Sequence, residues 1–186
     1  MMLQEKLQKE LSPKRYQHSL RVAREAVLLA QITGFDTQKA QIGGLLHDCA
    51  KHLEDNQLIA IAQQMGYTIS KQEQEIPHLL HAPVGAWFAR IHYGIVDPEI
   101  LQAISRHALG GPEPSLLDQI VYTADFMEPN RVHTPSFSKK FQSVLQNNFH
   151  QAVIIVIKEK LRRLKATGRQ PHPYTQKFLW CIENLD

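Results

Sequence analysis

The feature that most constrains the fold is the spacing of the apolar residues, which recur three and four positions apart along nearly the whole chain. This spacing places them on one face of an α-helix, because an α-helix has about 3.6 residues per turn. The segment AVIIVI (152–157) has the β-branched composition of a strand, but its polar flanks favour a buried stretch of helix. The sequence therefore predicts an all-α fold.

Helix start and stop signals divide this pattern into eight or nine helices. Ser12-Pro13 predicts a helix start, and Gly34 predicts the end of that helix. We expect further helices from Asp36 through Leu53, from Asp55 to Gly66, around 84–94, from Asp97 to about His107 and from Ser115 to about Phe126, then two or three more that are broken near 147–148, at Gly168 and at Pro171/Pro173. Residues 67–80, 110–114 and 127–136 are predicted to be loops. With 186 residues, 43% of them hydrophobic, and no linker or repeat, we expect one compact domain over residues 1–186.

Charge and composition narrow the class of partner. The formal net charge of +3 suits an anionic small molecule and is too small to predict binding to nucleic acid. The basic run KEKLRRLKATGR (158–169) is predicted to be a solvated helix end. The two cysteines cannot build a disulfide framework, no window resembles a membrane span, and the N-terminal segment lacks the apolar core of a signal peptide. We therefore expect a cytoplasmic protein that binds neither membranes nor nucleic acid.

Several polar residues occupy positions where the helical pattern calls for apolar ones. In GGLLHDCAKHL (43–53), a His-Asp pair interrupts an apolar run, although burying such groups without a partner is unfavourable by several kcal/mol or so. Taken alone, a histidine such as His18 or His107 is more typical of a core residue and an aspartate of a cap, whereas the adjacent His47-Asp48 pair suits either interpretation equally. Together, four imidazoles and two carboxylates form a suitable ligand set for iron, zinc or manganese. The six residues of this set are His18, His47, Asp48, His81, His107 and Asp125.

The order of these residues carries a family resemblance. The blocks RYQHSLRVA (15–23), LLHDCAK (45–51), LLHAPVGAWFA (79–89), AISRHALGG (103–111) and YTADFMEPNR (122–131) resemble the YqeK family of HD-domain metal-dependent phosphohydrolases. PHPYT (171–175) is similar to the tail of that family, so the resemblance covers nearly the whole chain. The resemblance implies a single compact HD-domain helical bundle over residues 1–186.

The resemblance also implies an activity and a pair of metal ions. The activity would be the symmetrical hydrolysis of diadenosine tetraphosphate into two ADP, and the metal would most often be iron, with manganese or zinc as alternatives. One ion would be held by His18, His47, Asp48 and Asp125, and the other by His81 and His107, with Asp48 bridging the two ions. His78 is the rival of His81 for its place, and we prefer His81 because APVGA follows it.

Substrate contacts follow less directly from the resemblance. Asp48 and Lys51 are predicted to be catalytic, and Lys51, Gly110 and Arg131 are predicted to bind the substrate phosphates. The family usually has HTTGR where this chain has His107 followed by ALGG (108–111). Two hydroxyls and an arginine that could hold phosphate oxygens are therefore missing, which bears on the affinity for substrate or on its choice.

Other functions stay open at this point. The same site could act on a nucleoside monophosphate or triphosphate or on a cyclic dinucleotide. A non-catalytic domain that binds a nucleotide or a metal and signals through a partner is a further alternative. Trp87, Phe88 and Trp180 could supply the apolar face of a homodimer as readily as core.

Overall fold

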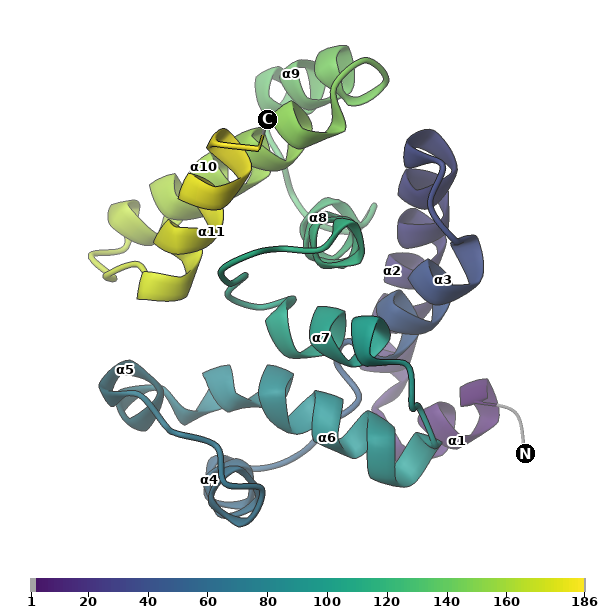
Figure 1. Cartoon of the computed structure of the whole chain (residues 1–186), viewed down its shortest axis with the longest axis vertical. Helices are drawn as coiled ribbons and strands as arrows, with labels where there is room; N and C mark the ends of the chain where they lie inside the picture. Colours follow the sequence, from purple (N-terminus) through teal and green to yellow (C-terminus); the bar gives the residue numbers. More distant parts are fainter. Residues whose placement is uncertain (1–2, 186) are drawn as a thin grey trace.

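The computed structural model describes residues 3–185. Within this range, every element of regular secondary structure is helical (Figure 1), so the predicted all-α class is confirmed. The elements are α1 (Leu3–Glu10), α2 (Pro13–Thr33), α3 (Thr37–Leu46), α4 (Asp55–Gln64), α5 (Lys71–Glu75), the 3-10 helix η1 (Pro77–Leu80), α6 (His81–Tyr93), α7 (Pro98–Arg106), α8 (Leu116–Met127), α9 (Pro135–Leu145), α10 (Phe149–Ala166) and α11 (Pro173–Glu183).

The predicted helix boundaries rest on capping contacts that the structure shows. The Ser12 hydroxyl accepts a hydrogen bond from the Arg15 backbone N–H at the start of α2, and Gly34 ends that helix with φ of 68°. Asp36 caps α3 in the same way. Ser115 and Asp118 form a reciprocal capping box at the start of α8. These local hydrogen bonds involve neighbours in sequence, which is why the sequence predicts them.

The eleven α-helices of residues 3–185 exceed the predicted eight or nine because two short ones were not expected. Helix α1 lies in the polar N-terminal segment, where Leu7 is buried. Helix α5 lies in the segment predicted to be a loop, and a capping box between Ser70 and Glu73 starts it. The helix predicted to continue to Leu53 is also wrong in length, because α3 ends at Leu46 and residues 47–53 form turns and a bend.

Helix α8 is the central element of the fold (Figure 1), and it contacts α2, α3, α7 and α10. Its buried residues include Leu117, Ile120 and Val121, which belong to the main apolar core. Helices α2 and α3 form a close antiparallel pair on one side of α8; Gly44 of α3 permits a short approach to α2, and Gly43 faces α8. The polar side chains on α8 and its neighbours therefore face a common interior.

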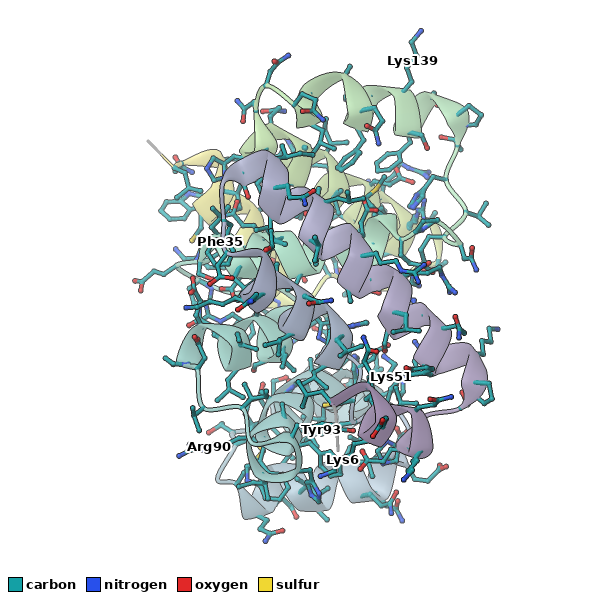
Figure 2. All side chains as sticks on the ribbon, turned by 90° about the vertical axis from the view of Figure 1, so that its right-hand side faces the viewer. Lys6, Phe35, Lys51, Arg90, Tyr93 and Lys139 are labelled. Carbon is teal, nitrogen blue, oxygen red and sulfur yellow. The ribbon has the colours of Figure 1, made fainter. Side chains whose placement is uncertain are left out.

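Two further groups of helices flank this centre (Figure 1): α9, α10 and α11 pack together on one side, and η1, α4 and α6 form a smaller apolar cluster on the other. Helix α1 is fastened to the end of α6, because Lys6 donates to the His92 carbonyl and Tyr93 donates to Glu10; Figure 2 shows Lys6 and Tyr93 close together. Trp180, which could belong either to the core or to the apolar face of a homodimer, is 55% exposed. Within residues 3–185, no helix has both the length and the apolar character that crossing a membrane requires.

Candidate metal centre

The six predicted metal ligands, from five segments of the chain, lie together in the interior. His18 projects from α2 and Asp125 from α8, His47 and His107 cap the C-terminal ends of α3 and α7, Asp48 follows His47, and His81 begins α6. All are buried except Asp125, whose side chain is 18% exposed. Because α3 ends at Leu46 and the chain turns there, neighbouring His47 and Asp48 can both face the same centre.

Asp48 lies between two groups of imidazoles. Its Oδ2 lies 3.7 Å from His18 Nε2 and 3.4 Å from His47 Nε2. Its Oδ1 lies 3.4 Å from His81 Nε2 and 3.5 Å from His107 Nε2. A carboxylate with one oxygen toward each group has the arrangement of a bridging ligand between two metal ions.

The remaining ligand atoms close around the two oxygens of Asp48. His18 Nε2 lies 3.2 Å from His47 Nε2 and 3.1 Å from Asp125 Oδ1. His81 Nε2 lies 3.1 Å from His107 Nε2. Two sets of atoms are compact enough to hold an ion: that of His18, His47 and Asp125, and that of His47, Asp48 and His107. His47 takes part in both sets, and the short distances to His107 and Asp48 place His81 beside the second.

Backbone carbonyls fix the orientation of three of the four imidazoles. His47 Nδ1 donates to the Gly44 carbonyl at 2.7 Å, His107 Nδ1 donates to the Ile104 carbonyl at 2.7 Å, and His81 Nδ1 donates to the His78 carbonyl. Because a carbonyl only accepts, each Nδ1 carries a proton, and Nε2 is the nitrogen that each ring turns toward the centre. The Nε2 atoms of His81 and His107 lie 3.1 Å apart, and when both rings are neutral their lone pairs repel each other unless a cation binds beside both. The donor set therefore fits metal ions.

A carboxylate holds the fourth imidazole. His18 Nδ1 lies 3.3 Å from Glu128 Oε1, and Glu128 also accepts a hydrogen bond from Arg21 Nε at 2.6 Å. Carboxylate partners of this kind orient a metal-binding imidazole and raise its basicity. The chain thus supplies partners outside the ligand set as well as the ligands themselves.

Positive side chains already neutralise the two carboxylates. Arg15 NH1 lies 2.7 Å from Asp48 Oδ2, and Arg131 NH2 lies 2.7 Å from Asp125 Oδ1. Lys51 Nζ lies 3.7 Å from Asp48 Oδ1 and 2.9 Å from His81 Nε2. In Figure 2, Lys51 lies in the middle of the view, whereas Lys139 projects outward from the edge. Three cationic side chains, those of Arg15, Lys51 and Arg131, therefore lie against the carboxylates, as expected of a site that binds cations.

The carboxylates of the centre are ionised. Burial acts to raise the pKa of Asp48, but the charge of His47 and a hydrogen bond with His107 outweigh burial and hold it well below its usual range. Burial likewise acts to raise the pKa of Asp125, and the hydrogen bond with His18 reverses this effect, so that the pKa lies well below the usual range. Ionised carboxylates are the form that binds metal ions.

Two imidazoles on the Oδ1 side of Asp48 are held neutral. Burial lowers the pKa of His81 well below its usual range, and the nearby charge of Lys51 adds to this effect. Burial also lowers the pKa of His107, although a hydrogen bond with Asp48 opposes it. A neutral imidazole has a free lone pair for a metal ion, so this side is in the protonation state that metal binding requires.

A cleft of about 630 Å³ opens next to the centre and shares His18 with it. Four of its lining side chains are cationic, and Glu128 is its one anionic residue. Such a lining attracts phosphate groups. The lining residues are Ser12, Lys14, Arg15, Gln17, His18, Arg21, Glu128, Asn130 and Arg131.

The structure gives the positions of His78, the alternative to His81, and of Gly110, a predicted substrate contact. His78 is exposed, and its Nδ1 lies 4.0 Å from Asp55 Oδ1 at the surface, so the geometry favours His81 as the inward-facing residue. Gly110 is buried with φ of 72°, and a Cβ there would lie 2.3 Å from Phe178 Cδ1. Packing against Phe178 therefore requires glycine at this position, whether or not it also meets a substrate.

Sequence reasoning missed three residues around the centre. Arg15 lies one turn before His18 on α2, and this spacing was the available signal. Glu128 and Lys160 gave no comparable signal, because their partners lie more than 50 residues away. Lys160 also corrects the prediction that 158–169 is entirely solvated: it is half-buried, and its ammonium donates to the Ala108 carbonyl.

The chain is similar in sequence to known proteins. The model of the HD domain family matches residues 15–130. The proteins to which the chain is similar include two that are named symmetrical bis(5'-nucleosyl)-tetraphosphatase. It is 40% identical over 123 residues to the one from Halalkalibacterium halodurans, which covers 65% of this chain and 64% of that protein, just under two thirds of its length. It is 33% identical over 180 residues to the one from Bacillus subtilis, which covers 95% of this chain and 94% of that protein.

A solved structure shows the same fold. It is from Clostridium acetobutylicum and is described as a predicted HD superfamily hydrolase involved in NAD metabolism. It superposes with a TM-score of 0.90 at 33% identity, over 97% of this chain and 94% of that one. The matched region of the family model, residues 15–130, contains all six residues of the metal centre. The chain belongs to the HD domain family.

Proposed function

We propose that this protein is a metal-dependent symmetrical dinucleoside tetraphosphatase that hydrolyses diadenosine tetraphosphate into two ADP. The observation that carries the proposal is Asp48, which directs one oxygen toward each of two groups of imidazoles beside a positively charged cleft. The two similar proteins named for this activity support the choice of substrate.

The ligand assignment follows the distances. His18, His47, Asp48 and Asp125 would hold one metal ion, and His81 and His107 would hold the other, with Asp48 shared between them. The imidazole-rich set suits iron, with manganese or zinc as alternatives. When bound, two such ions supply Lewis acidity toward the phosphoryl oxygens and lower the pKa of a water molecule.

The chain's own residues bind and orient the polyphosphate. Arg15, Arg131 and Lys51 lie against the carboxylates of the centre, from which they can turn to the phosphate oxygens once cations occupy it. Arginine offers a fork of donors that matches a phosphate group, and lysine offers a point charge. These side chains would hold the substrate so that water attacks a central phosphorus and the central P–O–P bond breaks, which yields two ADP.

Product analysis tests the proposal. The protein would be purified anaerobically, loaded with iron and incubated with diadenosine tetraphosphate, and the products would be separated by ion-exchange chromatography. ADP as the sole nucleotide product supports symmetrical hydrolysis. AMP together with ATP would contradict the cleavage of the central P–O–P bond. No turnover by protein that holds its metal would overturn the proposed substrate and favour another nucleotide.

A variant tests the bridging role of Asp48. Asp48→Asn keeps the size of the side chain but removes the charge that faces both groups of imidazoles, so we expect metal content and turnover to be lost together. Asp55→Asn is the matched control, because Asp55 is exposed and is not one of the six candidate ligands. Full metal content with full turnover in Asp48→Asn would refute the bridging role.

A further inference from the structure

A half-buried lysine outside the predicted site contacts residues that neighbour two of the candidate ligands. Lys160 of α10 donates a hydrogen bond from Nζ to the Ala108 carbonyl at 2.6 Å. Its ammonium also lies 4.3 Å from the centroid of the Tyr122 ring. Ala108 directly follows His107, and Tyr122 lies one turn before Asp125 on α8. Lys160 thus lies between the two segments that carry His107 and Asp125.

The ammonium of Lys160 has few partners for its charge. Among residues 3–185, the Ala108 carbonyl is its one hydrogen-bond acceptor, and no carboxylate forms an ion pair with it. An ammonium has three donors, and burying it without an anion is costly. Lys158, two residues earlier on the same helix, differs in both respects: its side chain is 59% exposed and pairs with Glu183 at 2.7 Å.

The charges that act on Lys160 belong to the candidate site. Burial lowers the pKa of Lys160 to about 8, the charge of Asp125 opposes this effect, and the charges of Arg131 and Lys51 add to it. The ammonium is therefore within electrostatic range of three residues that surround the centre. It is still mostly protonated near pH 7 and can act as a cation there.

The segment that follows His107 has no side-chain hydrogen-bond donor of its own. Residues 108–111 read ALGG, so their side chains offer no hydrogen-bond donor beside His107. Arg106, the nearest arginine in sequence, is committed elsewhere, because its NH1 donates to the Pro112 carbonyl at 2.8 Å and lies 3.2 Å from Asp118 Oδ2. Lys160 is a cation that the fold brings to the start of this segment, at Ala108.

We propose that Lys160 is a substrate-binding residue of this site, whose ammonium contacts a phosphate oxygen of the polyphosphate chain next to Ala108. The identity of the substrate rests on the proposed function, whereas the binding of a polyphosphate anion does not. A phosphate oxygen supplies the anion that the buried ammonium lacks, and a charge-assisted hydrogen bond results.

Calorimetric titration with inorganic tripolyphosphate tests this role on the metal-loaded protein. We expect Lys160→Met to weaken binding about ten-fold or more, the scale of a hydrogen bond to a charged group. Lys158→Met, the matched control on the same helix, is expected to bind like the wild type. In hydrolysis assays, Lys160→Met should raise KM with little change in kcat.

The rival explanation is that Lys160 only fastens α10 to Ala108 and Tyr122. A Lys160→Met protein that melts at a lower temperature but binds tripolyphosphate like the wild type would overturn the proposal. The Lys160→Gln variant controls for misfolding, because glutamine keeps a donor for the Ala108 carbonyl and removes only the charge. Unchanged tripolyphosphate binding by this variant would also overturn the proposal. Wild-type protein that binds tripolyphosphate in a Lys160-dependent way but leaves diadenosine tetraphosphate intact would refute the proposed function and retain this inference.

Discussion

The contact between α2 and α3 sets the geometry of the metal centre, and Gly44 makes that contact possible. A Cβ at Gly44 would lie 2.9 Å from Ala23 Cα, 3.0 Å from the Val22 carbonyl oxygen and 3.1 Å from Ala26 Cβ. Two of these atoms belong to the backbone, so no side-chain rotation relieves the contact. Because carbon atoms pack best at about 3.5–4.0 Å, Gly44→Ala must push the two helices apart by about 0.6 Å or more.

The expected loss of stability follows from two opposing effects. Overpacking of this kind costs about 1–3 kcal/mol, whereas alanine is favoured over glycine in a helix by about 1 kcal/mol. We expect a net loss of about 1–2 kcal/mol, since the clash involves backbone. For a chain of this size that loss lowers the melting temperature by about 2–8 °C.

A neighbouring glycine provides the matched control. A Cβ at Gly43 would lie 3.0 Å from Val121 Cγ2, a side-chain atom, which can shift by a few tenths of an ångström more easily than backbone can. Gly43→Ala should therefore be close to neutral, because the gain in helix propensity of about 1 kcal/mol offsets a small rearrangement. Thermal and urea denaturation of both metal-free variants, followed by circular dichroism, would measure the difference.

The same substitution should weaken the metal centre. His18 on α2 and His47 at the end of α3 place their Nε2 atoms 3.2 Å apart across this contact. The methyl group added at residue 44 pushes the helices apart and widens that separation. The Gly44→Ala protein should therefore bind metal more weakly than the Gly43→Ala protein in a competition titration with a chromophoric chelator. Equal stability of the two variants would refute the packing argument, and equal metal affinity would refute the link between this contact and the site.

Two further predictions follow from side chains beside the centre. Glu128→Ala removes the partner of His18 Nδ1 and of Arg21, so we expect about 10–100-fold weaker metal binding in the same titration, and an unchanged affinity would show that His18 needs no such support. Burial raises the pKa of the Cys49 thiol well above its usual value, so at pH 8 iodoacetamide should alkylate the partly exposed Cys181 of the folded protein and leave Cys49 unmodified. Mass spectrometry of peptides after brief labelling would measure the modification of each cysteine. Labelling of Cys49 at the rate of Cys181 would contradict its burial.

Local signals were sufficient for most of the helices. Helix caps form hydrogen bonds with neighbours only a few residues away, and the structure confirms the boundaries predicted from Ser12, from Gly34 and from the capping box of Ser115 with Asp118. The prediction was wrong where local and long-range effects compete. Helix α1 forms in a polar segment because Leu7 is buried in the main core, and a sequence pattern does not reveal that contact.

The candidate ligands were also visible in the sequence, because histidine and aspartate on an apolar helix face are costly without a partner. Their surroundings were not. Arg15 with Asp48, Glu128 with His18 and Lys160 with Ala108 join residues 33, 110 and 52 positions apart. No periodicity relates such pairs, since each depends on how separate helices pack.

The sequence by itself determined the all-α class, most helix boundaries and the set of polar residues that need an internal partner, because these depend on local hydrogen bonds and on the 3.6-residue period. Only the tertiary structure decided that Asp48 faces two groups of imidazoles, that His81 rather than His78 points inward, and that a lysine from α10 bonds to Ala108, the residue after His107. The physical reason is that side chains from five segments meet only after the apolar faces of α2, α3, α7 and α8 have packed together.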